Sequence, residues 1–190
     1  GLVGSEMCIR DSYYINEFIS LGYSIPGAVV ALSIIIFFTS IDSNLAKISI
    51  LGGFLVYLFM LIYAYIIRFM AVGKTTLKAG FDKLPNSYDN TAKVLGLSDF
   101  NFFKKVLFPL NKLPLLSALI LVFIDIMKEL PITLILRPFN FDTLATQTFE
   151  FAIDEMIPKS AIYSLSIILI CSLLLVLFKK LLDRLHVSGD

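Results

Sequence analysis

The sequence predicts an all-α integral membrane protein. Hydrophobic residues make up 57% of the chain and charged residues 16%, and the mean hydropathy is +0.85. These values exceed those of soluble domains, which need more polar surface at this size. Four hydrophobic segments of 19 to 22 residues also match the length of about 20 residues with which a helix crosses a bilayer core. The high hydropathy leads us to expect contact with membrane lipid. The net charge of only +1 gives no positively charged surface of the kind that binds nucleic acid, so we expect no nucleic-acid partner.

The first twelve residues, Gly1–Ser12, fit no helix, strand or signal-peptide pattern. They resemble the in-frame translation of a transposase-type sequencing adapter, so we interpret them as a non-native scar. On this interpretation further membrane spans precede Tyr13 in the natural protein. The expected membrane domain covers residues 13–186, and residues 187–190 form a tail.

The first two predicted spans carry no charge. Tyr23–Ile41 has 19 residues and Ile48–Ile67 has 20. The first contains Pro26 and Gly27 close to its beginning, where proline suits a helix start and glycine a point of close packing. We therefore expect both segments to be membrane helices.

A polar, lysine-bearing loop at residues 74–112 follows the second span and has helix signals of its own. Ser87 can cap a short helix that ends at Gly96, where we expect a left-handed turn. Ser98 can cap a second helix, which we expect to run to Pro109 with an apolar side. Structured loops of this length are usually functional. The alternative is an amphipathic hairpin that lies on the lipid surface.

The third span, Leu115–Leu136, is unusual because it carries Asp125, Lys128 and Glu129 near its middle, whereas the fourth, Ser160–Phe178, is uncharged. An ionised side chain at mid-bilayer costs about 2.5 to 3.5 kcal/mol, so these groups are not expected to face lipid. Asp125 and Lys128 are three residues apart and can pair on a helix. The three residues either line a translocation pathway or gate, or form an ion-pair network that packs the bundle. Two carboxylates one turn apart are an incomplete site for a hard cation, so no metal site is predicted.

The distribution of basic residues predicts the orientation, because positively charged loops stay on the cytoplasmic side. Ten lysines and arginines flank the spans on one side: Lys74, Lys78, Lys83, Lys93, Lys104, Lys105, Lys112, Lys179, Lys180 and Arg184. The connections on the other side, Asp42–Lys47 and Arg137–Lys159, hold three basic residues: Lys47, Arg137 and Lys159. The second connection, Arg137–Lys159, is acidic. We therefore expect the loop at residues 74–112 and the C-terminus to be cytoplasmic.

The loop also resembles a known signature. Membrane subunits of binding-protein-dependent ABC importers carry Glu-Ala-Ala, three residues, Gly, nine residues, then an aliphatic residue, any residue, Leu and Pro. Here the corresponding positions are Asn90, Thr91, Ala92, Gly96, Val106, Phe108 and Pro109. The stretch "DIMKELPITLILRPFNFDTLATQTFE", Asp125–Glu150, resembles the ferric-iron branch of the family in particular. The likeness covers nearly all of Gly22–Phe178. This part of the chain resembles the carboxy-terminal half of permeases that fuse two such domains.

Asn90 replaces the acidic residue of the signature and Thr91 its first alanine. An ion pair that the family's glutamate would make to an ATPase is therefore not expected here. The resemblance otherwise implies a type I ABC importer transmembrane domain, whose cytoplasmic loop seats in a groove of a separate ATP-binding subunit. It also implies an external substrate-binding protein, a second permease domain, expected upstream on the same chain, and a bacterial inner-membrane location.

The predicted function is thus a permease that imports ferric iron by alternating access, with ATP hydrolysed on the partner subunit. Thiamine, sulfate and polyamines remain alternative substrates, and a secondary transporter or channel without ATP is the alternative class. We expect no enzymatic activity and no cofactor on this chain. The stretch "GKTT" at Gly73–Thr76 is similar to the end of a phosphate-binding loop, but Arg68 stands where that loop needs glycine.

Overall fold

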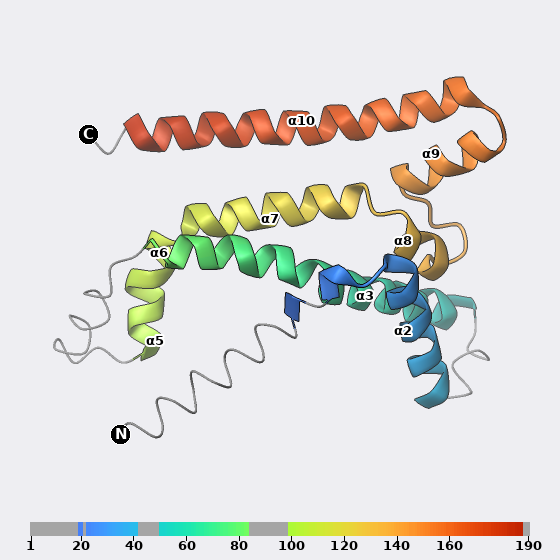
Figure 1. Ribbon diagram of the computed structural model, residues 1–190, viewed down its shortest axis with the longest axis horizontal. Coiled ribbons are helices and arrows are strands. Elements are labelled where there is room, and N and C mark those ends of the chain that lie inside the picture. The colour runs from blue at the N-terminus through green and yellow to red at the C-terminus, as the bar shows by residue number, and fades with distance from the viewer. Residues whose placement is uncertain (1–18, 21, 42–49, 84–98, 188–190) are drawn as a thin grey trace. The chain divides into compact units, whose positions relative to one another are not determined.

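The computed structural model describes residues 19–20, 22–41, 50–83 and 99–187, and every regular element in these ranges is helical (Figure 1). The elements are α2 (Gly27–Ile41), α3 (Ile50–Phe81), α5 (Asp99–Phe102), the π-helical segment η2 (Phe103–Leu107), α6 (Phe108–Leu110), α7 (Lys112–Met127), α8 (Pro131–Leu136), α9 (Leu144–Ile153) and α10 (Ile157–Val187). The chain divides into two compact units. Unit 1 comprises Gly1–Ala71 and Ile124–Ser172, and unit 2 comprises Val72–Phe123 and Leu173–Asp190.

The four hydrophobic segments correspond to α2, α3, α7 with α8, and α10. Within the described residues, Gly53–Phe81 and Ile157–Asp183 are each long and apolar enough to cross a membrane. Phe100–Leu110 and Lys112–Met127 would form a third span if the bent pair counts as one, and α2 is a shorter apolar helix over Gly27–Ser40. The all-α membrane class predicted from composition is confirmed.

Pro26 and Gly27 begin α2, as the sequence predicts. The carbonyl of Pro26 accepts hydrogen bonds from the backbone N–H groups of Val29 and Val30, at 3.0 and 3.2 Å. Proline fits this position because it lacks an N–H that the first turn of a helix would leave unpaired. The chain bends at Ile25 before α2 begins.

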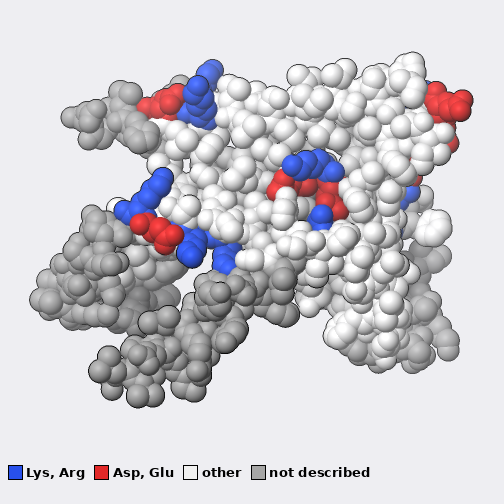
Figure 2. Space-filling view, in the orientation of Figure 1, with Lys and Arg blue, Asp and Glu red and all other residues white. Residues whose placement is uncertain are grey.

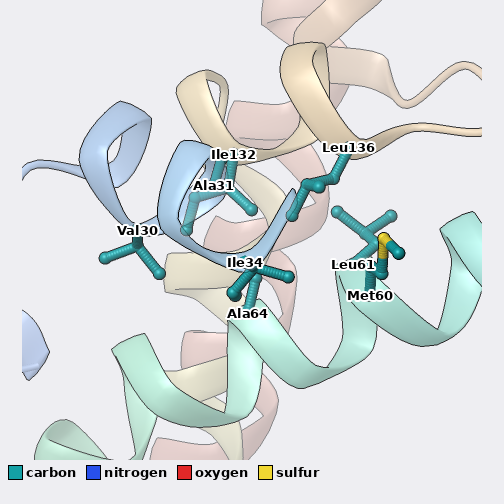
Figure 3. Close-up of a cluster of buried hydrophobic side chains, with 8 residues drawn as sticks. All are labelled: Val30, Ala31, Ile34, Met60, Leu61, Ala64, Ile132 and Leu136. Atoms are coloured by element: carbon teal, nitrogen blue, oxygen red, sulfur yellow. The ribbon is translucent and has the colours of Figure 1, made fainter. Parts of the chain in front are cut away.

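The core of unit 1 lies where α2, α3 and α8 meet (Figure 3). Each helix contributes residues spaced for one face: Val30, Ala31 and Ile34 from α2, Met60, Leu61 and Ala64 from α3, and Ile132 and Leu136 from α8. The alanines are fully buried, and small residues let membrane helices approach closely. Large apolar side chains on the other faces of α2 and α3 are exposed, as expected of surfaces that meet lipid.

The third span is not one continuous helix. We expected a helix over Leu115–Leu136, but α7 ends at Met127 and α8 begins at Pro131. A helix that continued would bring the Pro131 ring against the carbonyl of Met127, and the proline has no N–H to donate to it. Lys128 and Glu129 therefore lie in a short connection between two helices.

The connection between the third and fourth spans contains a helix, α9, that the sequence analysis did not anticipate. Its start is fixed by a reciprocal pair of hydrogen bonds: the Thr146 N–H donates to Thr143 Oγ1 at 3.3 Å, and the Thr143 N–H donates to Thr146 Oγ1 at 2.8 Å. This capping box was the available signal, in an unusual form with threonine in place of glutamate or glutamine. Ser160 of α10 donates to the Thr148 carbonyl at 2.8 Å, which ties α9 to α10.

Candidate functional site

The predicted loop at residues 74–112 is only partly a loop. Helix α3 continues to Phe81, so the first eight residues of the expected loop extend the second span. No proline interrupts this stretch, and Lys78 in the last turn is favourably placed near the negative end of the helix dipole. The signature positions Asn90, Thr91, Ala92 and Gly96 lie outside the described residues, and so does the turn expected at Gly96.

The second loop helix is present as a continuous helical segment from Asp99 to Leu110, made of α5, η2 and α6. The Phe108 N–H donates to the Phe103 carbonyl, which is the i to i+5 pattern of a π-helix. We expected this helix to end at Pro109, and that was wrong. In an α-helix the Pro109 ring would clash with the carbonyl of Lys105, and the wider π turn removes this conflict so that the helix continues.

The Asp99–Leu110 segment exposes large apolar side chains. Phe100, Phe103 and Phe108 are 71%, 50% and 45% exposed, and Lys104 and Lys105 are exposed beside them. Phe102, Val106 and Leu107 form the half-buried side. The spacing of Phe102, Phe103, Val106 and Leu107 predicts that Phe103 lies on that side as well, but Phe103 is exposed. The segment therefore presents aromatic and basic groups together.

A bend of 70° at Asn111 separates this segment from α7. The Asn111 backbone N–H and its Nδ2 both donate to the Leu107 carbonyl at 3.0 Å, and its own carbonyl accepts from the Leu115 N–H at 2.9 Å. On the same side, α3 approaches closely through Gly80: a Cβ on Gly80 would lie 2.4 Å from Pro114 Cβ. The bend is thus held by hydrogen bonds on both sides and by one contact that needs glycine.

The charged residues of the third span divide into two ion pairs in unit 1. Lys128 Nζ lies 2.8 Å from Asp125 Oδ1, which is the pair expected from their spacing. The Lys128 side chain is 65% exposed and that of Asp125 is 16% exposed. Figure 2 shows charged side chains of both signs near the C-terminal end of α7, surrounded by uncharged surface.

The second pair joins Glu129 to Arg68 of α3, a partner that the sequence analysis missed. Arg68 Nε lies 3.5 Å from Glu129 Oε2, and the two side chains are 18% and 10% exposed. The available signal was a single arginine at the end of an uncharged span of 20 residues. Such a cation needs a buried carboxylate, and Glu129 was the acidic residue without a predicted partner.

A third cluster lies in the acidic connection after α8. Arg137 forms ion pairs with Asp142 and Glu150, and it thereby links the end of α8 to α9. Between these residues Asn140 has a φ of 58°, and Phe139 is 98% exposed. The described residues contain no group of three or more His, Cys, Asp or Glu that could hold a metal ion.

The family model for the inner membrane component of binding-protein-dependent transport systems matches residues 12–187. This chain belongs to that family. The permease chain is also 27% identical, over 167 residues, to the protein named Fe(3+)-transport system permease protein FbpB 2 from Haemophilus influenzae. The match covers 88% of this chain and 31% of the relative, so the chain spans about a third of the relative's length. No solved structure gives a significant match.

Membership of the family settles the fold class in more detail than the helices alone. The chain contains a type I ABC importer transmembrane domain, in agreement with the resemblance seen in the loop and in Asp125–Glu150. The family and the apolar helices together indicate a multi-pass protein of the inner membrane.

Proposed function

We propose that this permease chain helps to import ferric iron that an external binding protein delivers, with ATP hydrolysed on a separate subunit. The substrate is inferred from the relative whose name specifies transport of Fe(3+), and from the similar stretch Asp125–Glu150. A second permease domain is expected to complete the pathway, upstream on the same natural chain.

The observation that carries the proposal is the helical Asp99–Leu110 segment. It ends in Val106, Phe108 and Pro109 of the signature, and it presents exposed phenylalanines and lysines. An ATPase groove can bind such a surface through apolar burial and charge together. The segment is joined to α7 by a bend with hydrogen bonds on both sides. A rigid segment of this kind can pass on a displacement that a flexible connection would absorb.

The proposed pathway involves Asp125, Lys128 and Glu129, which are expected to serve as its lining or gate. Lys128 is the most exposed of the three, and Glu129 is buried against Arg68. The proposed orientation places the loop and the C-terminus in the cytoplasm and the acidic connection with α9 outside, in accordance with the distribution of lysine and arginine.

Reconstitution of the complete permease with its ATPase and its iron-loaded binding protein tests the proposal. We expect iron to enter proteoliposomes only when ATP and the binding protein are both present. Uptake that persists without ATP would indicate a secondary transporter or channel instead. ATP-dependent uptake of thiamine, sulfate or a polyamine, with none of iron, would overturn the substrate while leaving the importer class intact.

A further inference from the structure

Arg68 of α3 lies where three other stretches of unit 1 come together: Tyr23 to Ile25, the α7–α8 connection and the start of α2. Its Nη1 donates a hydrogen bond to the Ile25 carbonyl at 2.5 Å, and its guanidinium carbon lies 5.9 Å from the centre of the Tyr23 ring. Its Nε faces Glu129 Oε2 in the connection between α7 and α8. The third stretch is the start of α2, where a Cβ on Gly27 would lie 3.5 Å from Arg68 Cζ.

Gly27 allows the ion pair to sit directly beneath α2. A Cβ at this position would lie 2.7 Å from Glu129 Oε1 and 3.2 Å from Ile132 Cγ1. The Glu129 carboxylate is thus enclosed by α2, by Arg68 and by the first turn of α8, whose Ile132 N–H lies 3.4 Å from Oε1. Arg68 can reach Glu129 in this way only while α2, α3 and the α7–α8 connection stay together.

The geometry of the pair is poor for a structural ion pair. Arg68 Nε is buried and has no hydrogen-bond partner in the described part of the chain, and the 3.5 Å separation from the carboxylate is long for a charge-assisted hydrogen bond. Buried ion pairs offset the cost of removing charges from water only when their geometry is excellent. A pair of this geometry is therefore weaker than a well-formed buried ion pair, and each of its charges would need another partner or water once the two side chains part.

The pair also flanks the one break in the third span. Lys128, Glu129 and Leu130 separate α7 from α8, and Glu129 is the member of this connection that is tied to another helix. The neighbouring pair, Asp125 with Lys128, lies within the third span itself. Arg68 is thus the side chain by which α3 restrains the break.

We propose that Arg68 and Glu129 form a latch that holds the α7–α8 break against α2 and α3 in the resting permease and opens during transport. Arg68 is a positioning residue in this account, because it acts through Glu129 and touches no substrate. This inference rests on the proposed function, because the latch would open between the states of an ATP-driven importer.

Removal of one charge tests the latch in the complete, reconstituted permease with its ATPase and iron-loaded binding protein. Arg68→Gln should reach the membrane, raise ATP hydrolysis in the absence of the binding protein at least about fivefold, because the buried Glu129 carboxylate loses its partner, and lower iron uptake per ATP. A merely structural pair would lower the amount of permease without changing the ATPase activity per complex. Resting ATPase activity equal to the wild type in an assembled Arg68→Gln permease would overturn the proposal.

The double variant Arg68→Gln/Glu129→Gln covers the case in which the single variant fails to assemble. It leaves no unpaired buried charge, so it should assemble normally and still show raised ATP hydrolysis without the binding protein. Failure of the double variant to assemble, or wild-type resting activity in it, would show that the pair is not a latch. Lys180→Gln, an exposed charge in α10 outside the Asp99–Leu110 segment, serves as the matched control for loss of one positive charge, read by its resting ATPase activity.

The same assay separates the latch from the proposed function. If the wild-type complex neither takes up iron nor responds to the binding protein with ATP hydrolysis, the proposed function fails. If the wild type does both and the two charge variants behave like it, only the latch fails.

Discussion

At the scale of single residues, small side chains decide how closely the helices approach. Gly27 lets α2 lie against Glu129 and Ile132, and Ala31 and Ala64 let α2, α3 and α8 share one core. A membrane helix gains no hydrophobic stabilisation by leaving lipid for a neighbour of equal polarity, so close packing has to supply the attraction. Positions at which an added methyl group meets a fixed neighbour should therefore be sensitive.

The first prediction concerns Gly27→Ala. The new Cβ would lie 2.7 Å from the end of the Glu129 side chain and 3.2 Å from Ile132 Cγ1. The carboxylate can turn away only by leaving its place beside Arg68, so we expect a loss of about 1 kcal/mol in the free energy of unfolding, at the lower end of the usual scale of overpacking. The matched control is Gly53→Ala in α3, where nothing lies within 4 Å of the added atom. That variant should be neutral or stabilised by about 0.5 to 1 kcal/mol, because alanine favours a helix more than glycine does.

Unfolding of the purified complete permease in detergent measures both variants. An unfolding midpoint for Gly27→Ala equal to that of Gly53→Ala would contradict the close approach of α2 to Glu129.

At the scale of elements, breaks in the helices are as informative as the helices. The sequence identifies the hydrophobic segments, the start of α2 at Gly27 and the Asp125–Lys128 pair, since these depend on local spacing. The pair of Arg68 with Glu129 depends on a contact between segments that lie far apart in the sequence, and the π turn from Phe103 to Phe108 departs from the regular helix that the apolar spacing assumes. Local patterns contain neither of these features, so the features could not be predicted with the same certainty.

The second prediction concerns the bend at Asn111. In Gly80→Ala the new Cβ would lie 2.4 Å from Pro114 Cβ, and the proline ring has little freedom to move away. We expect α3 and the bend to separate slightly, which should lower iron uptake and weaken retention of the ATPase while the permease still reaches the membrane. Gly73→Ala in the same helix is the control, because its added atom would lie at an ordinary 3.7 Å from Val122 Cγ2.

Co-purification of the ATPase with each variant, alongside iron uptake in cells, gives the answer. Equal retention and uptake for Gly80→Ala and Gly73→Ala would mean that this contact plays no part in coupling.

At the scale of the whole molecule, the proposed function depends on how the chain crosses the membrane. Basic residues gather in the loop at residues 74–112 and after Phe178, and the connection with α9 is acidic. Helix α10 supports its assignment as a span, because the described part of the chain buries no residue of its most apolar window, and such an apolar surface is expected to meet lipid or another permease domain. Composition and length predict such a span from sequence alone, whereas the partner that covers it lies beyond what one chain specifies.

The third prediction tests the orientation. Single cysteines replace Phe139, which is 98% exposed in the acidic connection, and Lys104, which is exposed in the loop, after Cys171 has been changed to serine. An impermeant thiol reagent applied to intact cells should label the cysteine at position 139 and leave the one at 104 unlabelled until the cells are opened. Labelling of position 104 in intact cells would invert the proposed topology.

The central claim is that the Asp99–Leu110 segment couples this permease to an ATPase, and the exposed Phe100 and Phe103 test it most directly. Their joint replacement by alanine removes side chains that are 71% and 50% exposed, so the fold should be kept. The control is Leu169→Ala, which removes an equally exposed apolar side chain from α10. The measurement is ATP-dependent iron uptake beside co-purification of the ATPase with the complete permease. We predict that Phe100→Ala/Phe103→Ala loses about 90% or more of both, the loss expected when buried aromatic anchors worth more than 1 kcal/mol each are truncated, while Leu169→Ala retains them. Full uptake with full ATPase retention in the double variant would contradict the account.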